Sequence, residues 1–262
     1  MIPFGAEYAS QYDLIYADKD YASEAAFVRD VIDRHRPCTR SILDFGCGSG
    51  RHAIEFVRAG LCVTGLDRSA EMISRGRHRI EQQLAPHLRS QLTLIQGDAT
   101  THRSAATYDA VVSLFHVVSY QTTNEALLGI FNSARAALAK DGLFVFDFWY
   151  GPAVLTKGPE VRVRRINTPT GPVTRIAEPE HHVNRNIVHV KYTLISIDQI
   201  SARAEQVAEL HSVRYLFLPE IEFFAAQTGF EIVETGEWLT GKSLDQHCWS
   251  GYVAARASAV RG

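Results

Sequence analysis

Apolar positions follow two patterns along this chain, one with the period of a helix and one made of short buried runs. From 22 to 36, apolar residues recur every three or four positions, which predicts an amphipathic helix that Pro37 ends. The run SILDF at 41–45 predicts a buried strand, and HAIEFVRAG after it predicts a second helix that stops at Gly60. A glycine-rich turn, GCGSG, joins that strand to that helix.

The same strand-and-helix unit then recurs. Further strands are predicted at 62–67, 92–98, 108–120, where the strand runs into a loop, and 143–150, and helices at 69–84 and 124–142. A helix at 219–230 and strands at 231–238 and 249–257 continue the pattern. Strands that alternate with helices predict an α/β fold, here a Rossmann-like, doubly wound, mostly parallel sheet of about seven strands.

Residues 160–217 break this pattern, because apolar and polar positions alternate there without helical periodicity. Four strand-like runs separated by turns predict an antiparallel β insertion laid over one end of the main sheet. A chain of 262 residues suits one large domain with such an addition. We therefore expect a core made of 1–159 and 218–262, with an N-terminal lid segment, and an insertion made of 160–217.

Composition narrows the range of functions. The net charge is −2 and basic residues are scattered, so a nucleic-acid partner is not expected. The four cysteines lack C-x-x-C spacing, so neither a metal site nor a disulfide framework is expected. No apolar run approaches the ~20 residues that span a bilayer, and the N-terminus lacks a secretory leader pattern. These features favour a cytoplasmic protein without a membrane partner.

The strongest chemical signal is LDFGCGSG at 43–50, where glycines follow a strand and precede a helix. Glycine permits a tight turn and close approach of a ligand to the backbone, and the helix start offers unpaired N–H groups. Asp67 ends the second strand, where it can accept hydrogen bonds from ribose hydroxyls, and Asp98 ends the third. Successive strand ends meet at one crevice, so these residues predict a single cofactor pocket. A nicotinamide site would need glycine at 51, which is Arg51.

Four segments, in order, resemble the motifs of one enzyme family. They read LDFGCGSGRH, VTGLDRSAEMI, LIQGDAT and YDAVVSLFHVVSY, and they resemble motifs I to IV of the class I S-adenosylmethionine-dependent methyltransferases. The resemblance extends from Tyr8 to about Ala257. It implies S-adenosyl-L-methionine as the cofactor, with its methionine part on the glycine loop, its ribose on Asp67, its adenine amino group near Asp98 and its own amino group near Asp44.

The cofactor-binding residues that the resemblance and the strand ends imply are Asp44, Gly46, Cys47, Gly48, Gly50, Asp67, Arg68, Met72, Asp98, Ala99 and Leu114. Met72 either packs on the adenine or is a core methionine.

Three flanking segments, YDLIYADKDYASEAAF, FDFWYGPAVL and ELHSVRYLFLPEIEFFAAQTGF, are similar to small-molecule N-methyltransferases that dimethylate nucleotide-linked amino sugars. The resemblance implies methyl transfer to a small-molecule acceptor, an amine or hydroxyl of a sugar or nucleotide-linked sugar. Two alternatives stay open, N-methylation of a small amino acid or amine, and a non-catalytic protein that senses the cofactor or binds a partner. Either a monomer or a homodimer is compatible with the sequence.

Candidate acceptor residues come from the loops after the fourth and fifth strands, which open toward the transferred methyl group. They are His116, Ser119, Tyr120, Trp149 and Tyr150. His116 is either the base that assists proton removal or a core histidine bonded to a carbonyl, and the two aromatic residues either contact the acceptor or only pack.

Residues outside these loops complete the acceptor site that we expect. Tyr12 and Tyr16 are expected in a lid, with Tyr12 or Tyr120 able to orient an amine. His211 and Arg214, in the last strand of the insertion, either face the acceptor, where Arg214 would suit a phosphate, or face solvent.

Overall fold

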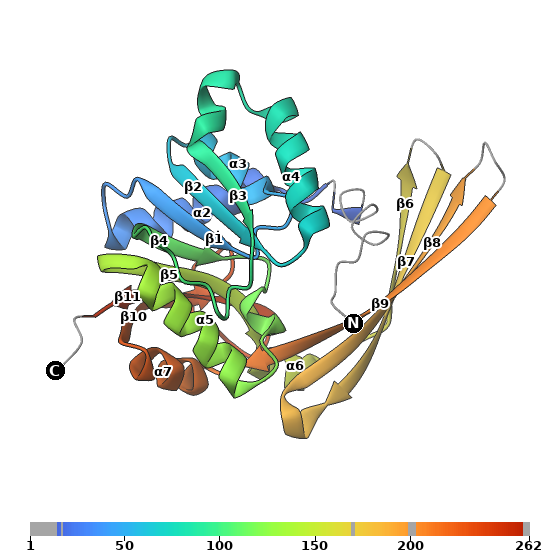
Figure 1. Cartoon of the computed structure of the whole chain (residues 1–262). Coiled ribbons are helices and arrows are strands. Elements are labelled where there is room, and N and C mark those ends of the chain that lie inside the picture. The colour runs from blue at the N-terminus through green and yellow to red at the C-terminus, as the bar shows by residue number, and fades with distance from the viewer. Residues whose placement is uncertain (1–14, 17, 169–170, 199–202, 259–262) are drawn as a thin grey trace.

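The computed structural model describes residues 15–16, 18–168, 171–198 and 203–258 (Figure 1). Its helices and short 3-10 turns are α2 Tyr21–His35, α3 Arg51–Arg58, α4 Ala70–Gln83, η1 Pro86–Gln91, η2 Val118–Tyr120, α5 Asn124–Ala137, α6 Gly151–Lys157, η3 Val183–Arg185 and α7 Leu218–Gln227. Its strands are β1 Ser41–Phe45, β2 Cys62–Asp67, β3 Leu92–Gln96, β4 Tyr108–Ser113, β5 Leu138–Tyr150, β6 Arg162–Thr168, β7 Gly171–His182, β8 Ile187–Asp198, β9 Arg203–Leu216, β10 Phe230–Glu237 and β11 Ser250–Ala257. Within these ranges no helix is both long and apolar enough to cross a bilayer.

The central sheet has the order β3-β2-β1-β4-β5, with β11 and then β10 on the far side of β5. Strands β1 to β5 are parallel, whereas β11 runs antiparallel to both β5 and β10. The strand order reverses between β1 and β4, which is where doubly wound sheets bind ligands. The predicted Rossmann-like sheet is confirmed.

Alternation along the buried strands divides the core into two layers. Ile42, Ala110 and Leu143 pack toward α2, α3 and α4 on one face. Residues one position along, such as Leu43 and Phe144, pack toward α5 and α7 on the other face. Figure 1 shows the two helical layers on opposite sides of the sheet. Burial on both faces explains why these strands are continuous apolar runs.

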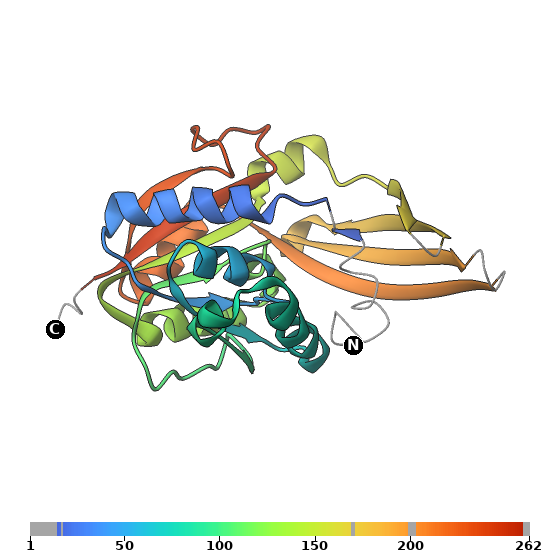
Figure 2. The same ribbon diagram turned by 90° about the horizontal axis from the view of Figure 1, so that it is seen from above.

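The insertion is a run of four antiparallel strands in the order β6-β7-β8-β9, which continues the central sheet beyond β5. Its only pairing with a core strand in the described chain is through β9, where Tyr215 and Leu216 pair with Trp149 and Tyr150 of β5. The four strands extend well beyond the core in both views (Figures 1 and 2). The predicted antiparallel strands are therefore confirmed.

One local prediction was wrong, and one helix was missed. The segment 138–142 was predicted as the end of a helix, but β5 begins at Leu138, directly after α5. The helix α6 was not predicted, because its seven residues are too few to show a helical period, although Pro152 near its start is a helix-start signal.

Candidate active site

One cavity of about 430 Å³ lies where β1, β2 and β4 end, and the inner face of the insertion closes its other side. It has the size of a small-molecule site. The core side is lined by Gly46, Gly48, Leu66, Asp67, Arg68, Ser69, Met72, Gly97, Asp98, Ala99, Leu114, Phe115, His116, Val117, Tyr120, Gln121, Trp149 and Trp249. The opposite side is lined by Tyr16, Pro159, Glu160, Arg162, Arg175, Ala177, Pro179, Val190, Tyr192, His211 and Val213.

The glycine loop between β1 and α3 adopts a left-handed backbone that side chains disfavour. Gly46, Gly48 and Gly50 have φ of 73°, 55° and 74°. A Cβ on Gly46 would lie 2.5 Å from Cγ2 of Val117, whereas a Cβ on Gly48 would meet no described atom within 4 Å. The loop therefore packs against the loop after β4 at Gly46 and presents open backbone to the cavity at Gly48.

Asp67, at the end of β2, presents a carboxylate whose two oxygens are both held by the backbone. Oδ2 accepts the N–H of Gly48 at 2.8 Å and Oδ1 accepts the N–H of Ser69 at 2.8 Å. Burial raises the pKa of Asp67, and the hydrogen bonds from these two backbone N–H groups partly oppose that rise. Each oxygen keeps a lone pair, so the carboxylate fits the ribose hydroxyls of the expected cofactor.

Asp44 lies in β1, two residues before Gly46 of the glycine loop, and is 2% exposed. No described group forms a hydrogen bond with its Oδ2. Burial, with the nearby Asp67 carboxylate, raises the pKa of Asp44 to about 7. A buried carboxylate in this position fits the cationic amino group of S-adenosylmethionine. When bound, that cofactor would supply an electrophilic methyl group from its sulfonium.

Asp67→Ala should weaken cofactor binding by roughly 1–3 kcal/mol, because it removes hydrogen bonds to a charged acceptor. Calorimetric titration with S-adenosylhomocysteine measures this loss. Glu71→Ala, on the next helix and outside the cavity lining, is the matched control and should bind as the wild type does. Equal affinities of the Asp67 variant and the wild type would contradict the ribose role.

Asp44 should make the stability of the cofactor-free protein depend on pH. Its folded pKa of about 7 exceeds the usual value of 3.8, so the folded state binds more protons between these limits and stability falls as pH rises through that window. The loss is at most on the order of 4 kcal/mol. Asp44→Asn, which cannot ionise, should therefore gain thermal stability over the wild type as pH rises from 5 to 8. Asp141→Asn, at an exposed carboxylate, is the control, and a pH-independent difference for Asp44→Asn would refute the prediction.

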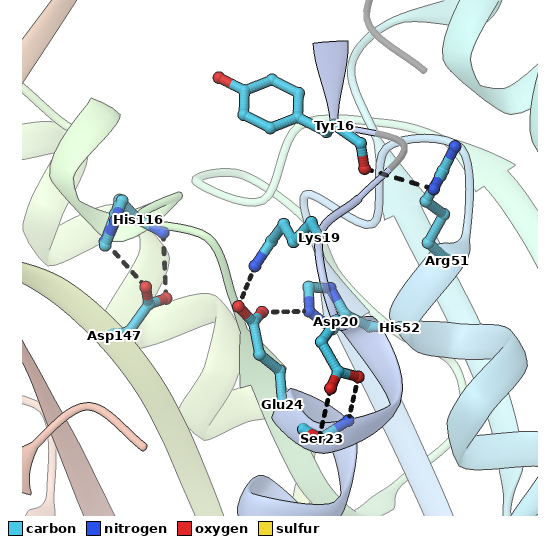
Figure 3. A network of polar contacts seen from close by, with 9 residues as sticks. All are labelled: Tyr16, Lys19, Asp20, Ser23, Glu24, Arg51, His52, His116 and Asp147. Carbon is cyan, nitrogen blue, oxygen red and sulfur yellow. Dashed lines mark hydrogen bonds and ion pairs between the residues drawn. The ribbon is translucent and has the colours of Figure 1, made fainter. Parts of the chain in front are cut away.

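His116 lines the cavity and is held by Asp147, which lies near the end of β5. The backbone N–H of His116 donates to Asp147 Oδ1 at 3.0 Å, and Nδ1 of its ring lies 2.8 Å from Oδ2 (Figure 3). The ring contact has the distance of an ion pair but not the angle of a hydrogen bond. Phe115 and His116 both have φ of 64°, a strained backbone that the Asp147 contacts help to hold.

The segment before α2 reaches the cavity through Tyr16, whose ring meets that of Phe115 edge to face at 5.1 Å. Behind it, Lys19 and His52 both contact the buried carboxylate of Glu24, His52 at 2.7 Å (Figure 3). The Lys19 ammonium also lies 4.5 Å from the centre of the Phe115 ring. These contacts tie the described part of the segment to the loop after β4.

The insertion contributes a polar cluster to the opposite wall. The hydroxyl of Tyr120 lies 2.8 Å from Nδ1 of His211, and Nε2 of His211 lies 3.0 Å from Oε2 of Glu209. The ring of Tyr192 meets the His211 ring at 4.9 Å, and Arg175 lies over the Tyr192 ring. Core and insertion therefore meet in one hydrogen-bonded chain at the cavity.

Three predicted acceptor residues lie away from the cavity. Arg214 forms an ion pair with Glu220 and donates to Asn124, because it lies on the face of β9 opposite to His211. The Ser119 hydroxyl, fully buried, accepts the N–H of Trp149. Tyr150 packs on Phe148, on the face of β5 opposite to Trp149. The expectation that these side chains face the acceptor is therefore corrected.

The other expected residues divide into three groups. Most of the cofactor set lines the cavity, as do His116, Tyr120, Tyr16, Trp149 and His211. Asp44, Cys47 and Gly50 are not among the residues that line the cavity, and their cofactor role stays a prediction. Tyr12 lies outside the described residues. Within the described ranges, no three His, Cys, Asp or Glu side chains are arranged to hold a metal ion.

Several residues at the site were not predicted, including Asp147 and Glu209, which orient the two cavity histidines. Asp147 is a single carboxylate inside the apolar run LFVFDFWY, and this could have signalled a buried polar contact. Glu209 and Arg175 gave no such signal, because both lie in strands with regular alternation.

Comparison with known proteins finds methyltransferases among the relatives of this chain. Residues 42–142 match a family model described as a methyltransferase domain. The chain is 27% identical to the dTDP-3-amino-3,4,6-trideoxy-alpha-D-glucopyranose N,N-dimethyltransferase of Streptomyces venezuelae, over 89% of this chain and 94% of that protein. It is 26% identical to the dTDP-3-amino-3,6-dideoxy-alpha-D-glucopyranose N,N-dimethyltransferase of Streptomyces fradiae, over 75% of this chain and 74% of that protein.

Solved structures share the fold. An S-adenosylmethionine-dependent methyltransferase from Clostridium acetobutylicum superposes with a TM-score of 0.81 at 18% identity, covering 97% of this chain and 98% of that one. An amino pentose methyltransferase from Micromonospora echinaspora, solved with S-adenosylmethionine bound, gives 0.76 at 24% identity, covering 98% and 99%. Residues 42–142 therefore form a methyltransferase domain, and the sheet order, the glycine loop and the sequence matches together support an enzyme that uses S-adenosylmethionine.

Proposed function

We propose that this enzyme transfers methyl groups from S-adenosylmethionine to the amine of a nucleotide-linked amino sugar. The observation that carries the proposal is one continuous cavity, which runs from the glycine loop to the inner face of the insertion. Two curated relatives named as dTDP-amino sugar N,N-dimethyltransferases support it. The strands at 160–217 would then act as the cover of the acceptor.

The charge at the insertion side suits an acceptor that carries phosphate. Arg162 and Arg175 line the cavity from β6 and β7, on neighbouring strands of one face. Tyr192, Val190 and Val213 form an apolar surface between these arginines and the core. An arginine pair beyond an apolar wall would bind the diphosphate of a nucleotide sugar, whereas a small free amine needs no such group.

In-line displacement at a sulfonium requires mainly that nucleophile and methyl be held close together in line. Residues of this chain would provide that alignment, with Trp149 and Tyr120 beside the acceptor and His116 taking the proton that an ammonium must lose before attack. Asp147 would orient the His116 ring. Asp67 and the glycine loop would bind the cofactor.

The proposal is tested with three acceptors, a dTDP-linked amino sugar, the same sugar unlinked, and a small primary amine. Mass spectrometry should detect added methyl groups on the linked sugar together with S-adenosylhomocysteine. Methylation of only the small amine would support the alternative substrate class. Cofactor binding without turnover on any of the three would support a non-catalytic role.

Arg162→Ala should raise the KM for the linked sugar about 10–100-fold, by loss of a charged hydrogen bond, and leave the unlinked sugar unaffected. Arg165→Ala is the matched control, since this exposed arginine lies on the same strand but faces the other way. Equal effects of the two substitutions would contradict a phosphate site at Arg162.

We propose further that the protein is cytoplasmic and acts on a small molecule, not on nucleic acid. It is either a monomer or a homodimer. Light scattering of the purified protein would measure the oligomeric state.

A further inference from the structure

Two tryptophans meet in the wall of the cavity, and one of them was not predicted from the sequence. Trp149 near the end of β5 and Trp249 directly before β11 both line the cavity. Their rings meet edge to face, with the ring centroids 5.3 Å apart. Both residues are half-buried, so this indole pair packs on the protein and also presents apolar surface to a ligand.

The core and the insertion together hold the indole pair in place. The backbone N–H of Trp149 donates to the buried Ser119 hydroxyl at 3.1 Å. The backbone carbonyl of Trp249 accepts the N–H of Tyr150 at 2.9 Å. The side chains of both tryptophans pack against an apolar cluster that includes Ala177 of the insertion. A ligand that packs on these rings would therefore meet a surface that is already in position.

A series of contacts along the cavity wall leads from His116 through the indole pair to Arg162. The centroid of the His116 ring lies 6.4 Å from that of Trp149, with the rings edge to face. Ala177, in the apolar cluster on which the indoles pack, is paired in register with Arg162 on the neighbouring strand β6. His116 and Arg162 both line the cavity. The wall therefore leads from an imidazole, across apolar ring surface, to a guanidinium.

We propose that Trp249 and Trp149 are specificity-determining residues, on which the ring of the acceptor sugar packs, and that they favour sugars over small amines. The inference rests on the proposed function. One face of a sugar ring consists mainly of C–H groups, which leave water when they pack on an aromatic ring. An amine on a sugar so placed lies near His116, and a diphosphate linked to that sugar lies toward Arg162. The order of contacts along the wall matches the order of these groups in a nucleotide-linked amino sugar.

Trp249→Leu tests the inference, because leucine keeps the wall apolar but removes the flat ring. The KM for the linked and the unlinked amino sugar should rise about 5–50-fold at nearly unchanged kcat, since the lost contact is one of binding. The rate with a small primary amine, which has no ring to pack, should keep its wild-type value. Trp249→Phe should restore most of the affinity for both sugars. Trp238→Leu is the matched control, because this tryptophan packs on Phe27 outside the cavity lining, and it should leave every KM unchanged.

Inhibition by dTDP without a sugar separates sugar packing from nucleotide binding. As a competitive inhibitor, dTDP should keep its wild-type affinity in Trp249→Leu and lose affinity in Arg162→Ala. Calorimetry with S-adenosylhomocysteine should give wild-type affinity in both variants, which shows that the cofactor site remains folded. Equal losses for dTDP and for the linked sugar in Trp249→Leu would assign the indoles to the nucleotide and overturn the inference. A wild-type KM for both sugars in Trp249→Leu would also overturn it.

Intrinsic fluorescence tests the same contact without methyl transfer. The sequence has three tryptophans, and Trp238 is the one outside the cavity lining. With S-adenosylhomocysteine bound, saturating unlinked amino sugar should change the emission of Trp238→Leu as it changes that of the wild type. The double variant Trp149→Phe/Trp249→Phe should show no such change. An unchanged emission of Trp238→Leu would overturn the inference. A changed emission without methyl transfer to either sugar from S-adenosylmethionine would instead count against the proposed function.

Discussion

Replacement of His116 by alanine or asparagine is expected to lower turnover by on the order of 10²–10⁴ and to leave cofactor affinity nearly unchanged. The side chain lies in the cavity, and its Nδ1 faces the Asp147 carboxylate at 2.8 Å, which leaves the other ring nitrogen able to take a proton. Imidazole changes charge near neutral pH, so it suits proton removal from an ammonium. The rate of single-turnover methyl transfer by each variant, measured across pH, tests whether His116 removes the proton.

The pH profile separates a base from a packing residue. The loss of rate in His116→Asn should be largest at low pH and should shrink as pH rises, because more of the amine acceptor then arrives without the proton that the base removes. Asp147→Asn should cause a smaller loss, because the base remains but its ring is no longer oriented by a carboxylate. His87→Asn, at an exposed histidine, serves as the control. A His116 variant within threefold of the wild type at every pH would remove this residue from the mechanism.

Substitution of Gly46 by alanine is expected to cost about 2–5 kcal/mol, divided between stability and cofactor binding. Part of this free energy is backbone strain, because Gly46 has a left-handed φ of 73° that alanine disfavours. The larger part is the contact at 2.5 Å between the new Cβ and Val117, whose displacement would shift the neighbouring His116. Thermal unfolding and calorimetry with S-adenosylhomocysteine measure the two effects.

Gly60→Ala provides a matched control for the strain alone. Gly60 has φ of 86°, and a Cβ there would meet no described atom within 4 Å. Its substitution should cost about 1–2 kcal/mol and leave cofactor affinity intact. Identical behaviour of the two variants would show that the packing of Gly46 on Val117 is unimportant for the cofactor site.

The core could be predicted from sequence because its signals are local. The predicted strand ranges 41–45 and 62–67 match β1 and β2 residue for residue, since buried parallel strands are continuous apolar runs bounded by turns. The glycine loop and Asp67 were also found, because their chemistry depends on position at a strand end. In contrast, α6 is too short to show a period.

The acceptor site was predictable only in part, because it depends on which face of a strand a residue occupies. His211 and Arg214 are three positions apart in one strand, so they point to opposite faces, and both could not contact the acceptor. The same alternation separates Trp149 from Tyr150. Pairs such as His116 with Asp147 join segments 31 residues apart, and no spacing rule in one sequence reveals that contact.

The narrow junction between insertion and core bears on how this enzyme could be re-engineered. Only Trp149 with Tyr215 and Tyr150 with Leu216 pair across it in the described chain, while β6 to β9 bond chiefly to one another. The hairpins can therefore be lengthened, shortened or exchanged without shifting the register of β1, β2 or β4. Under the proposed function, cofactor and acceptor recognition would be modular, and libraries that recode the inward positions of β7 and β8 would test new acceptors while the cofactor site stays unchanged.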